Sequence, residues 1–139
     1  MPSTNSSCEL VDRFVAIWNE PSAEQRRTMV RGLWTEDALH VFQPPQEVLD
    51  AAAGLDVTAV FQARGHAELD KRVSRAYEEF IAPGQYTFRL AGEPKRVADA
   101  LRFTWEMVST DGTVAGVGLE FVVLAADGRI QLDYQFIES

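Results

Sequence analysis

The last third of the chain, residues 96–137, reads RVADALRFTWEMVSTDGTVAGVGLEFVVLAADGRIQLDYQFI. Apolar and polar residues alternate along much of it, which is the two-residue period of a β-strand. Asp111-Gly112 and Asp127-Gly128 separate the apolar runs, and Asp-Gly pairs in such places are typical of tight hairpin turns. The pattern predicts three antiparallel strands, over residues 96–108, 113–124 and 129–137.

The first half of the chain has helical patterns instead. Ser6 with Glu9 and Ser22 with Gln25 have the spacing of capping boxes, which begin helices. A third helix is expected over His66–Ile81 because its apolar residues recur at helical spacing. The remaining expectations are a loose tail at Met1–Asn5, a short strand at Ala38–Phe42, a strand through Tyr86, Phe88 and Leu90, and a turn at Gly92-Glu93-Pro94.

Residues 46–64 have a weaker pattern. A short helix near Glu47–Ala53, a break at Gly54 and an extended piece near Val57–Phe61 fit the sequence. We expect this segment to be an insertion that forms a rim or lid over a binding site, or else a surface excursion without a ligand role.

Length and composition limit the class of protein. A chain of 139 residues with 46% apolar residues fits a single domain with one core. The net charge of −8 disfavours nucleic acid and anionic membranes as partners. A single cysteine, Cys8, cannot form an internal disulfide. Because neither a signal peptide nor a long apolar run is recognisable, a cytoplasmic location is expected.

The predicted strand 113–124 is apolar on both of its faces. Val114, Val122 and Leu124 share one face, and Val117, Leu119 and Phe121 share the other. A sheet covered by helices on one side needs only one apolar face, so the other face needs a second cover. We therefore expect a homodimer that forms through the outer face of the sheet.

The order of these elements resembles the nuclear transport factor 2-like superfamily, and in particular its SnoaL-like branch. The resemblance spans nearly the whole chain and depends on five short stretches. They are Trp18-Asn19-Glu20, Trp34-Thr35-Glu36-Asp37-Ala38, Gly65, Arg102-Phe103-Thr104-Trp105 and Asp127-Gly128-Arg129-Ile130. The resemblance implies an α+β fold in which a cone-shaped, curved, mostly antiparallel sheet wraps around three helices, a cystatin-like α+β barrel. It also implies a mostly apolar pocket inside the cone and, in many members, a dimer.

The resemblance to the steroid isomerases of this superfamily gives a register for the sheet. Those enzymes carry an inward-facing carboxylic acid eight residues before the glycine of the final hairpin, and Glu120 has that position relative to Gly128. Their general base, an Asp before a Pro at the end of the first strand, is replaced here by Gln43. Their oxyanion Tyr aligns with Phe14. The steroid isomerase mechanism is therefore not expected.

Three ionisable residues are candidates for catalysis in this register. Glu120 lies in an apolar run, where burial would raise the pKa of its carboxyl. The alternatives are a structural ion pair with Arg102 or another basic residue, and a solvent-facing position. His40 is a candidate base or a hydrogen-bonded core residue. Asp133 either forms an acid–base pair with Glu120 or is solvated near the open end of the sheet. The expected pocket lining is Phe14, Trp18, Phe42, Leu101, Phe103, Trp105, Met107 and Gln135.

The sequence contains no motif for a metal, a nucleotide or a serine nucleophile, so no cofactor is expected. Two functions stay open. One is an isomerase, cyclase or dehydratase that acts by proton transfer on a small apolar carbonyl compound. In this version His40, near the mouth on an edge strand, takes the proton, and neutral Glu120 donates a hydrogen bond to the enolate oxygen. The other is a ligand-binding or accessory homodimer without catalysis.

Overall fold

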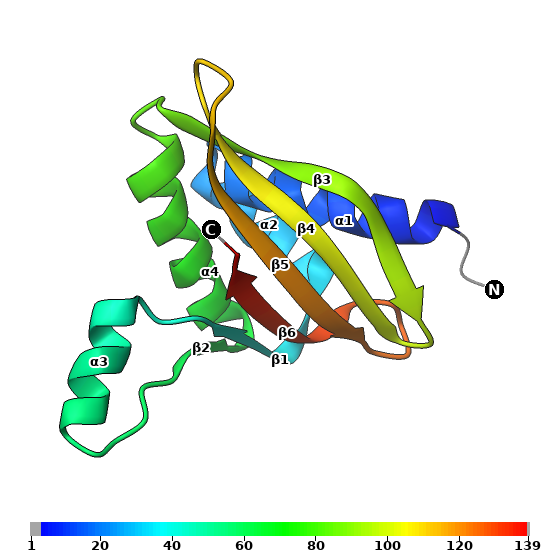
Figure 1. Ribbon diagram of the computed structural model, residues 1–139. Helices are drawn as coiled ribbons and strands as arrows, with labels where there is room; N and C mark the ends of the chain where they lie inside the picture. The colour runs from blue at the N-terminus through cyan, green and yellow to red at the C-terminus, as the bar shows by residue number, and fades with distance from the viewer. Residues whose placement is uncertain (1–3, 139) are drawn as a thin grey trace.

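The computed structural model describes residues 4–138, and they form four α-helices, one π-helical turn and six strands (Figure 1). The first half of the chain contains α1 (Thr4–Asn19), α2 (Ala23–Leu33), β1 (Trp34–Phe42), α3 (Gln46–Gly54), β2 (Phe61–Arg64) and α4 (Gly65–Ala76). A π turn, Tyr77–Ile81, continues α4. The second half contains β3 (Tyr86–Val97), β4 (Ala100–Ser109), β5 (Val114–Leu124) and β6 (Ile130–Ile137).

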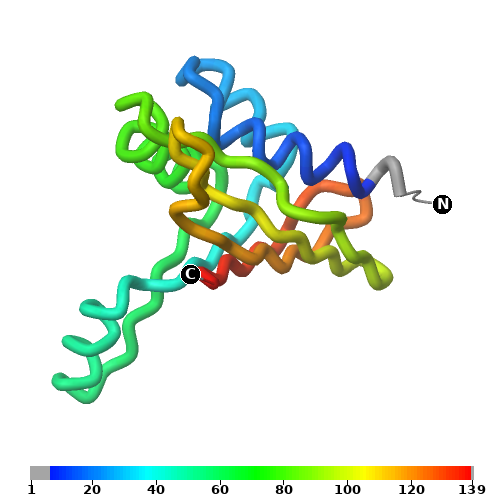
Figure 2. Tube along the Cα trace, turned by 45° about the horizontal axis from the view of Figure 1, so that its top comes forward, coloured from blue at the N-terminus to red at the C-terminus, as the bar shows by residue number. Residues whose placement is uncertain are grey.

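The six strands form one curved, open sheet in the order β2-β1-β6-β5-β4-β3. All neighbouring strands are antiparallel except β1 and β6, which are parallel. Helices α1, α2 and α4 lie on one side of the sheet, as Figures 1 and 2 show. This is the predicted α+β fold with a mostly antiparallel sheet, and the prediction is confirmed.

Both Asp-Gly turns form as predicted. Gly112 and Gly128 have φ values of 88° and 87°, in the left-handed region that favours glycine. In each turn the aspartate side chain accepts a hydrogen bond from a backbone N–H two residues later, at Thr113 and Arg129. These turns fix the register of β4, β5 and β6 relative to one another.

The predicted turn at Gly92-Glu93-Pro94 is wrong. β3 continues through these residues to Val97, with a register shift between Ala91 and Lys95, and the chain reverses at Ala98 and Asp99. A bulge accommodates both the positive φ of Gly92 and the missing N–H of Pro94 without ending the strand. β4 therefore begins at Ala100, four residues after the predicted start at residue 96.

The helices begin close to the predicted residues. Ser22 caps α2 by accepting a hydrogen bond from the Gln25 N–H at 3.2 Å. α1 begins at Thr4, two residues before the predicted cap at Ser6, and Met1–Ser3 lie outside the described residues. Asn19, at the end of α1, exchanges two hydrogen bonds with the backbone of Phe88 and so ties this helix to β3.

The core lies between the helices and the inner face of the sheet. Its largest buried side chains include Phe14 and Ile17 from α1, Trp34 from the start of β1, and Leu69 and Val73 from α4. Leu101 and Phe103 of β4 belong to the same cluster, and the Phe103 ring meets Phe14 edge-on at 4.9 Å between centroids. The inner face therefore has an apolar majority.

Helix α3 and the residues that follow it form an arm that projects from the body of the molecule, clearly visible in Figures 1 and 2. No residue of α3 is buried, and Leu55, Val57 and Val60 of the arm are more than half exposed, at 75%, 58% and 59%. Across the described part of the chain, no helix has the length and apolar character needed to cross a membrane.

Candidate active site

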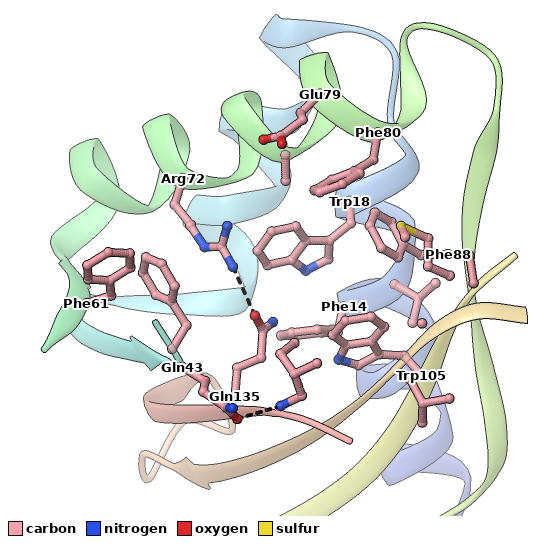
Figure 3. A pocket seen from close by; sticks show the side chains of 18 of the residues that line it. Phe14, Trp18, Gln43, Phe61, Arg72, Glu79, Phe80, Phe88, Trp105 and Gln135 are labelled. Atoms are coloured by element: carbon pink, nitrogen blue, oxygen red, sulfur yellow. Dashed lines mark hydrogen bonds between the residues drawn. The ribbon is translucent and has the colours of Figure 1, made fainter. Parts of the chain in front are cut away.

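A cavity of about 550 Å³ opens between the sheet, α1 and α4. Figure 3 shows that its wall is largely aromatic. Six of the eight expected lining residues lie there: Phe14, Trp18, Phe42, Trp105, Met107 and Gln135. Leu101 and Phe103 do not line it, because they are packed deeper in the core. Additional lining residues include Phe61, Arg72, Glu79, Phe80 and Phe88.

The strand pairings bring the three candidate ionisable residues together on the inner face. His40 of β1 is the direct partner of Asp133 on the parallel strand β6. Glu120 of β5 is the partner of Gln135, which is two residues beyond Asp133 on β6. Because side chains alternate between the faces of a sheet, Asp133, Gln135 and Glu120 share one face.

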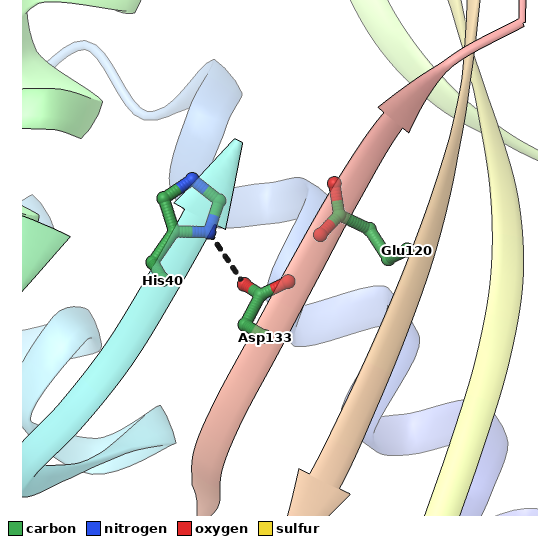
Figure 4. A group of neighbouring side chains, drawn as sticks. All are labelled: His40, Glu120 and Asp133. Atoms are coloured by element: carbon green, nitrogen blue, oxygen red, sulfur yellow. Dashed lines mark ion pairs between the residues drawn. The ribbon is translucent and has the colours of Figure 1, made fainter. Parts of the chain in front are cut away.

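The three side chains form one buried cluster, shown in Figure 4. His40 Nδ1 lies 3.0 Å from Asp133 Oδ2, within ion-pair distance but without the alignment of a hydrogen bond. One nitrogen or oxygen from each of the three residues lies within 4.8 Å of the others. All three side chains are 0% exposed. The cluster thus places two carboxyls and an imidazole in the least hydrated part of the molecule.

Glu120 is held through one of its two oxygens. Trp105 Nε1 donates to Oε1 at 3.0 Å, and Gln135 Nε2 donates to the same atom at 2.5 Å. Oε2 is buried and has no hydrogen-bond partner among the described residues. Two donors on Oε1 leave Oε2 as the oxygen that carries the proton when the carboxyl is neutral.

The environment moves the pKa values of the two carboxyls apart. Burial, followed by the negative charge of Asp133, raises the pKa of Glu120 well above its usual range. Burial would also raise the pKa of Asp133, but the nearby His40 and the neighbouring Glu120 carboxyl outweigh it and lower this pKa. These opposite shifts favour a protonated Glu120 beside an ionised Asp133.

The predicted position of His40 near the mouth of the cone is wrong. β1 is flanked by β2 on one side and by β6 on the other, so it is not an edge strand. The His40 imidazole stacks under the Phe42 ring at 5.2 Å between centroids and is covered by it. Asp133 is also fully buried, which excludes the solvated alternative for this residue. None of the three ionisable residues lines the cavity.

Gln135 joins the cluster to the cavity. Its amide nitrogen donates to Glu120, and its amide oxygen accepts from Arg72 Nη2 at 2.9 Å. Sequence reasoning missed Arg72, although the helical spacing contained a signal. Leu69, Val73 and Ala76 are the buried face of α4, and residue 72 lies on that face, three after Leu69 and four before Ala76.

Gly118 makes room for one of the Glu120 donors. It pairs with Trp105 across β5 and β4, and the indole lies over the glycine. A Cβ at this position would overlap the indole ring. The absence of a side chain at residue 118 is therefore required for the Trp105 position from which Nε1 reaches Glu120.

His40, Glu120 and Asp133 are also the group of described residues with ligand atoms close enough to hold a metal ion. One imidazole and two carboxylates are a donor set that divalent transition metals accept. A metal would need Glu120 in its ionised form, whereas burial and Asp133 favour the protonated form. A metal ion bound at this cluster would therefore have to displace the Glu120 proton.

No family model and no curated protein matches the sequence. Solved structures do match. A candidate isomerase of the SnoaL-like family from Agrobacterium tumefaciens aligns over 97% of this chain and 99% of its own, with 25% identity and a TM-score of 0.79. A SnoaL-like protein of unknown function from Burkholderia thailandensis aligns over 99% and 98%, with 12% identity and a TM-score of 0.67. A protein with a ketosteroid isomerase-like fold from Catenulispora acidiphila, in complex with trimethylamine, aligns over 92% and 84%, with 12% identity and a TM-score of 0.59.

These similar structures show the class of fold. The chain has the nuclear transport factor 2-like, or cystatin-like, α+β fold. Within this class the chain resembles SnoaL-like proteins, and the resemblance inferred from the sequence is confirmed at the level of the fold. Because one fold serves many functions, the chemistry has to be argued from the site.

Proposed function

We propose that this protein is a cofactor-independent enzyme that moves a proton on a small, largely apolar carbonyl compound, as isomerases, cyclases and dehydratases do. The observation that carries the proposal is the buried cluster of Glu120, Asp133 and His40 directly behind an aromatic cavity, in which the pKa values of the two carboxyls are moved apart. Two neighbouring carboxyls with pKa values moved apart are a frequent arrangement for acid–base catalysis.

In the proposed reaction Glu120 donates a hydrogen bond to the carbonyl oxygen as negative charge develops on it. His40 takes the proton from the adjacent carbon. When the imidazole is neutral with its proton on Nδ1, beside the Asp133 carboxylate, its lone pair is on Nε2, which has no hydrogen-bond partner among the described residues. Asp133 is a positioning residue that orients His40 and favours its protonated form after transfer.

Both reacting groups lie behind the cavity wall, so the substrate can reach them only when two side chains move. Phe42 covers His40, and Gln135 lies between Glu120 and Arg72. When the Gln135 amide moves away, Glu120 Oε1 loses the donor Nε2, and a substrate carbonyl oxygen accepts instead from the proton on Oε2. This exchange lets binding and exposure of the acid occur together.

The second candidate function is ligand binding without catalysis. The complete burial of His40, Glu120 and Asp133 favours this non-catalytic function, because a purely structural cluster needs no access to the cavity. The two functions differ in one measurable property, namely whether a bound ketone exchanges its α-protons with solvent.

The test is proton exchange of 1-tetralone, a rigid bicyclic ketone, in D₂O, followed by nuclear magnetic resonance. The wild type should accelerate the loss of the α-proton signals over buffer. Glu120→Ala should lower the rate by about a hundredfold or more, and Glu120→Gln, which keeps a donor, should retain more of it. His40→Ala should also lower the rate. Binding of the ketone without accelerated exchange would support the non-catalytic function and contradict the enzyme.

We also propose that the protein is a homodimer through the outer face of the sheet. Phe121, Tyr134 and Phe136 are large apolar or aromatic side chains on that face, and they are 39%, 37% and 47% exposed. Strand pairing places them side by side: Phe121 is the partner of Tyr134, and Leu119 is the partner of Phe136. A contiguous apolar patch of this kind is typical of a protein–protein interface.

A further inference from the structure

Arg72 is a cation in an aromatic cavity. Its guanidinium carbon lies 3.9 Å from the centroid of the Phe42 ring and 5.4 Å from that of Trp18. These contacts stabilise the positive charge through the faces of the rings. Figure 3 shows the guanidinium directed from α4 toward Gln135, at the centre of the lining residues.

Most of the hydrogen-bonding capacity of Arg72 is unused. The guanidinium has five N–H donors, and its one hydrogen bond among residues 4–138 is to the neutral oxygen of Gln135. Nε is buried without a partner, and no described carboxylate forms an ion pair with this side chain. Arg72 is half-buried, and a negative group in the cavity would satisfy donors that its protein contacts leave open.

The nearby acids do not supply this group. Glu120 and Asp133 form no ion pair with Arg72 and act on it only from a distance, and Asp133 lies against His40. Glu79 also lines the cavity, but it is an exposed residue of the π turn and forms no ion pair with Arg72. The planar guanidinium fork matches a carboxylate, which can accept two parallel N–H bonds.

We propose that Arg72 binds the carboxylate of the ligand, so that the molecule taken up by the cavity is a small apolar acid with a single negative charge. This inference rests on the proposed function only in taking the cavity as the ligand site. The aromatic wall of Phe14, Phe61, Phe80, Phe88 and Trp105 accommodates the apolar body. One cation and the neighbouring Glu79 favour a monoanion over a phosphate dianion.

The test compares two molecules that differ in charge and have almost the same shape. The probes are 3-benzoylpropionate and its primary amide, 4-oxo-4-phenylbutanamide, with binding measured by calorimetry and by the fluorescence of Trp18 and Trp105. The wild type should bind the acid at least about tenfold more tightly than the amide, since a charge-assisted pair contributes on the order of 1.5–3 kcal/mol.

Arg72→Met retains an apolar side chain of similar length and should bind the two probes within about twofold of each other. Arg72→Lys keeps the charge without the fork and should show a reduced preference for the acid. Arg75→Met is the matched control, because Arg75 lies on the same helix but is exposed and does not line the cavity. It should keep the wild-type preference. Thermal melts establish that each variant is folded.

Equal affinity of the wild type for acid and amide would overturn the assignment of the carboxylate while leaving the cavity as a ligand site. A preference for the acid that persists in folded Arg72→Met would overturn the role of Arg72. If neither probe binds to the wild type, the cavity is not the ligand site, and both this inference and the proposed function are wrong.

Discussion

Replacing Glu120 with Gln should abolish most of the loss of stability that the wild-type protein undergoes as the pH rises above about 5. The folded protein buries this carboxyl completely and raises its pKa well above the ordinary value of 4.5. Gln has nearly the same shape and carries no ionisable proton. The comparison therefore isolates the free energy of keeping one buried proton.

The sign follows from proton linkage. Below pH 4.5, the ordinary carboxyl value, both folded and unfolded chains bind the Glu120 proton, and the residue contributes no pH dependence. Above it the unfolded chain releases the proton and the folded chain keeps it, so the free energy of unfolding falls by about 1.4 kcal/mol per pH unit until the pH reaches the folded pKa. Between about pH 5 and pH 7 the wild type should therefore lose stability relative to the Gln variant, by an amount on the order of 1 kcal/mol or more.

The neighbouring carboxyl does not obscure this difference. The pKa of Asp133 is lowered from 3.8, so its contribution to stability is lost only as the pH falls below that value, outside the measured range. Urea unfolding of wild type and Glu120→Gln at several pH values measures the effect. Glu47→Gln, at an exposed position of α3, is the control and should follow the wild type. Parallel pH profiles for wild type and Glu120→Gln would refute the buried-proton assignment.

Three further changes test other parts of the structure. Gly118→Ala should lower the free energy of unfolding by about 1–3 kcal/mol because a Cβ overlaps the Trp105 indole, whereas Gly116→Ala, where the nearest contact is 3.8 Å, should cost less in urea unfolding. Deleting residues 48–58 should weaken binding of 3-benzoylpropionate several-fold in calorimetry if the arm is a lid, and unchanged affinity in a folded protein would contradict it. Phe121→Asp should convert the dimer to a monomer in sedimentation at micromolar concentration, and a monomeric wild type would contradict the proposed interface.

The alternating pattern of the last three strands predicted which residues share a face, and the register taken from the resemblance to the steroid isomerases predicted which face is the inner one. Once the Asp-Gly turns fixed the hairpins, Glu120 and Asp133 had to share a face with Trp105 and Gln135. The prediction of a turn at Gly92 was wrong because glycine and proline occur at β-bulges as well as at chain reversals. Only the pairing of β3 with β4 distinguishes a bulge from a reversal.

The burial of a side chain was harder to predict than the face of the sheet on which it lies. Alternation assigns His40 to the inner face, but its burial depends on the parallel pairing of β1 with β6, which joins residues more than ninety positions apart. A local pattern contains no information about such a pairing. The same limit explains why Arg72 was missed, since its significance comes from Phe42 and Gln135 on two strands distant in sequence.

The amide of Gln135 links the cavity electrostatically to the buried cluster. Its oxygen can accept from Arg72 only while its nitrogen faces Glu120, so the two hydrogen bonds fix a single orientation of the amide. An anion bound at Arg72 would draw that guanidinium away from Gln135 and add negative charge near Glu120. Both effects favour the protonated carboxyl, and by reciprocity the protonated carboxyl favours the bound anion. A carboxylate ligand would therefore hold the proposed acid in the form that can donate to the substrate.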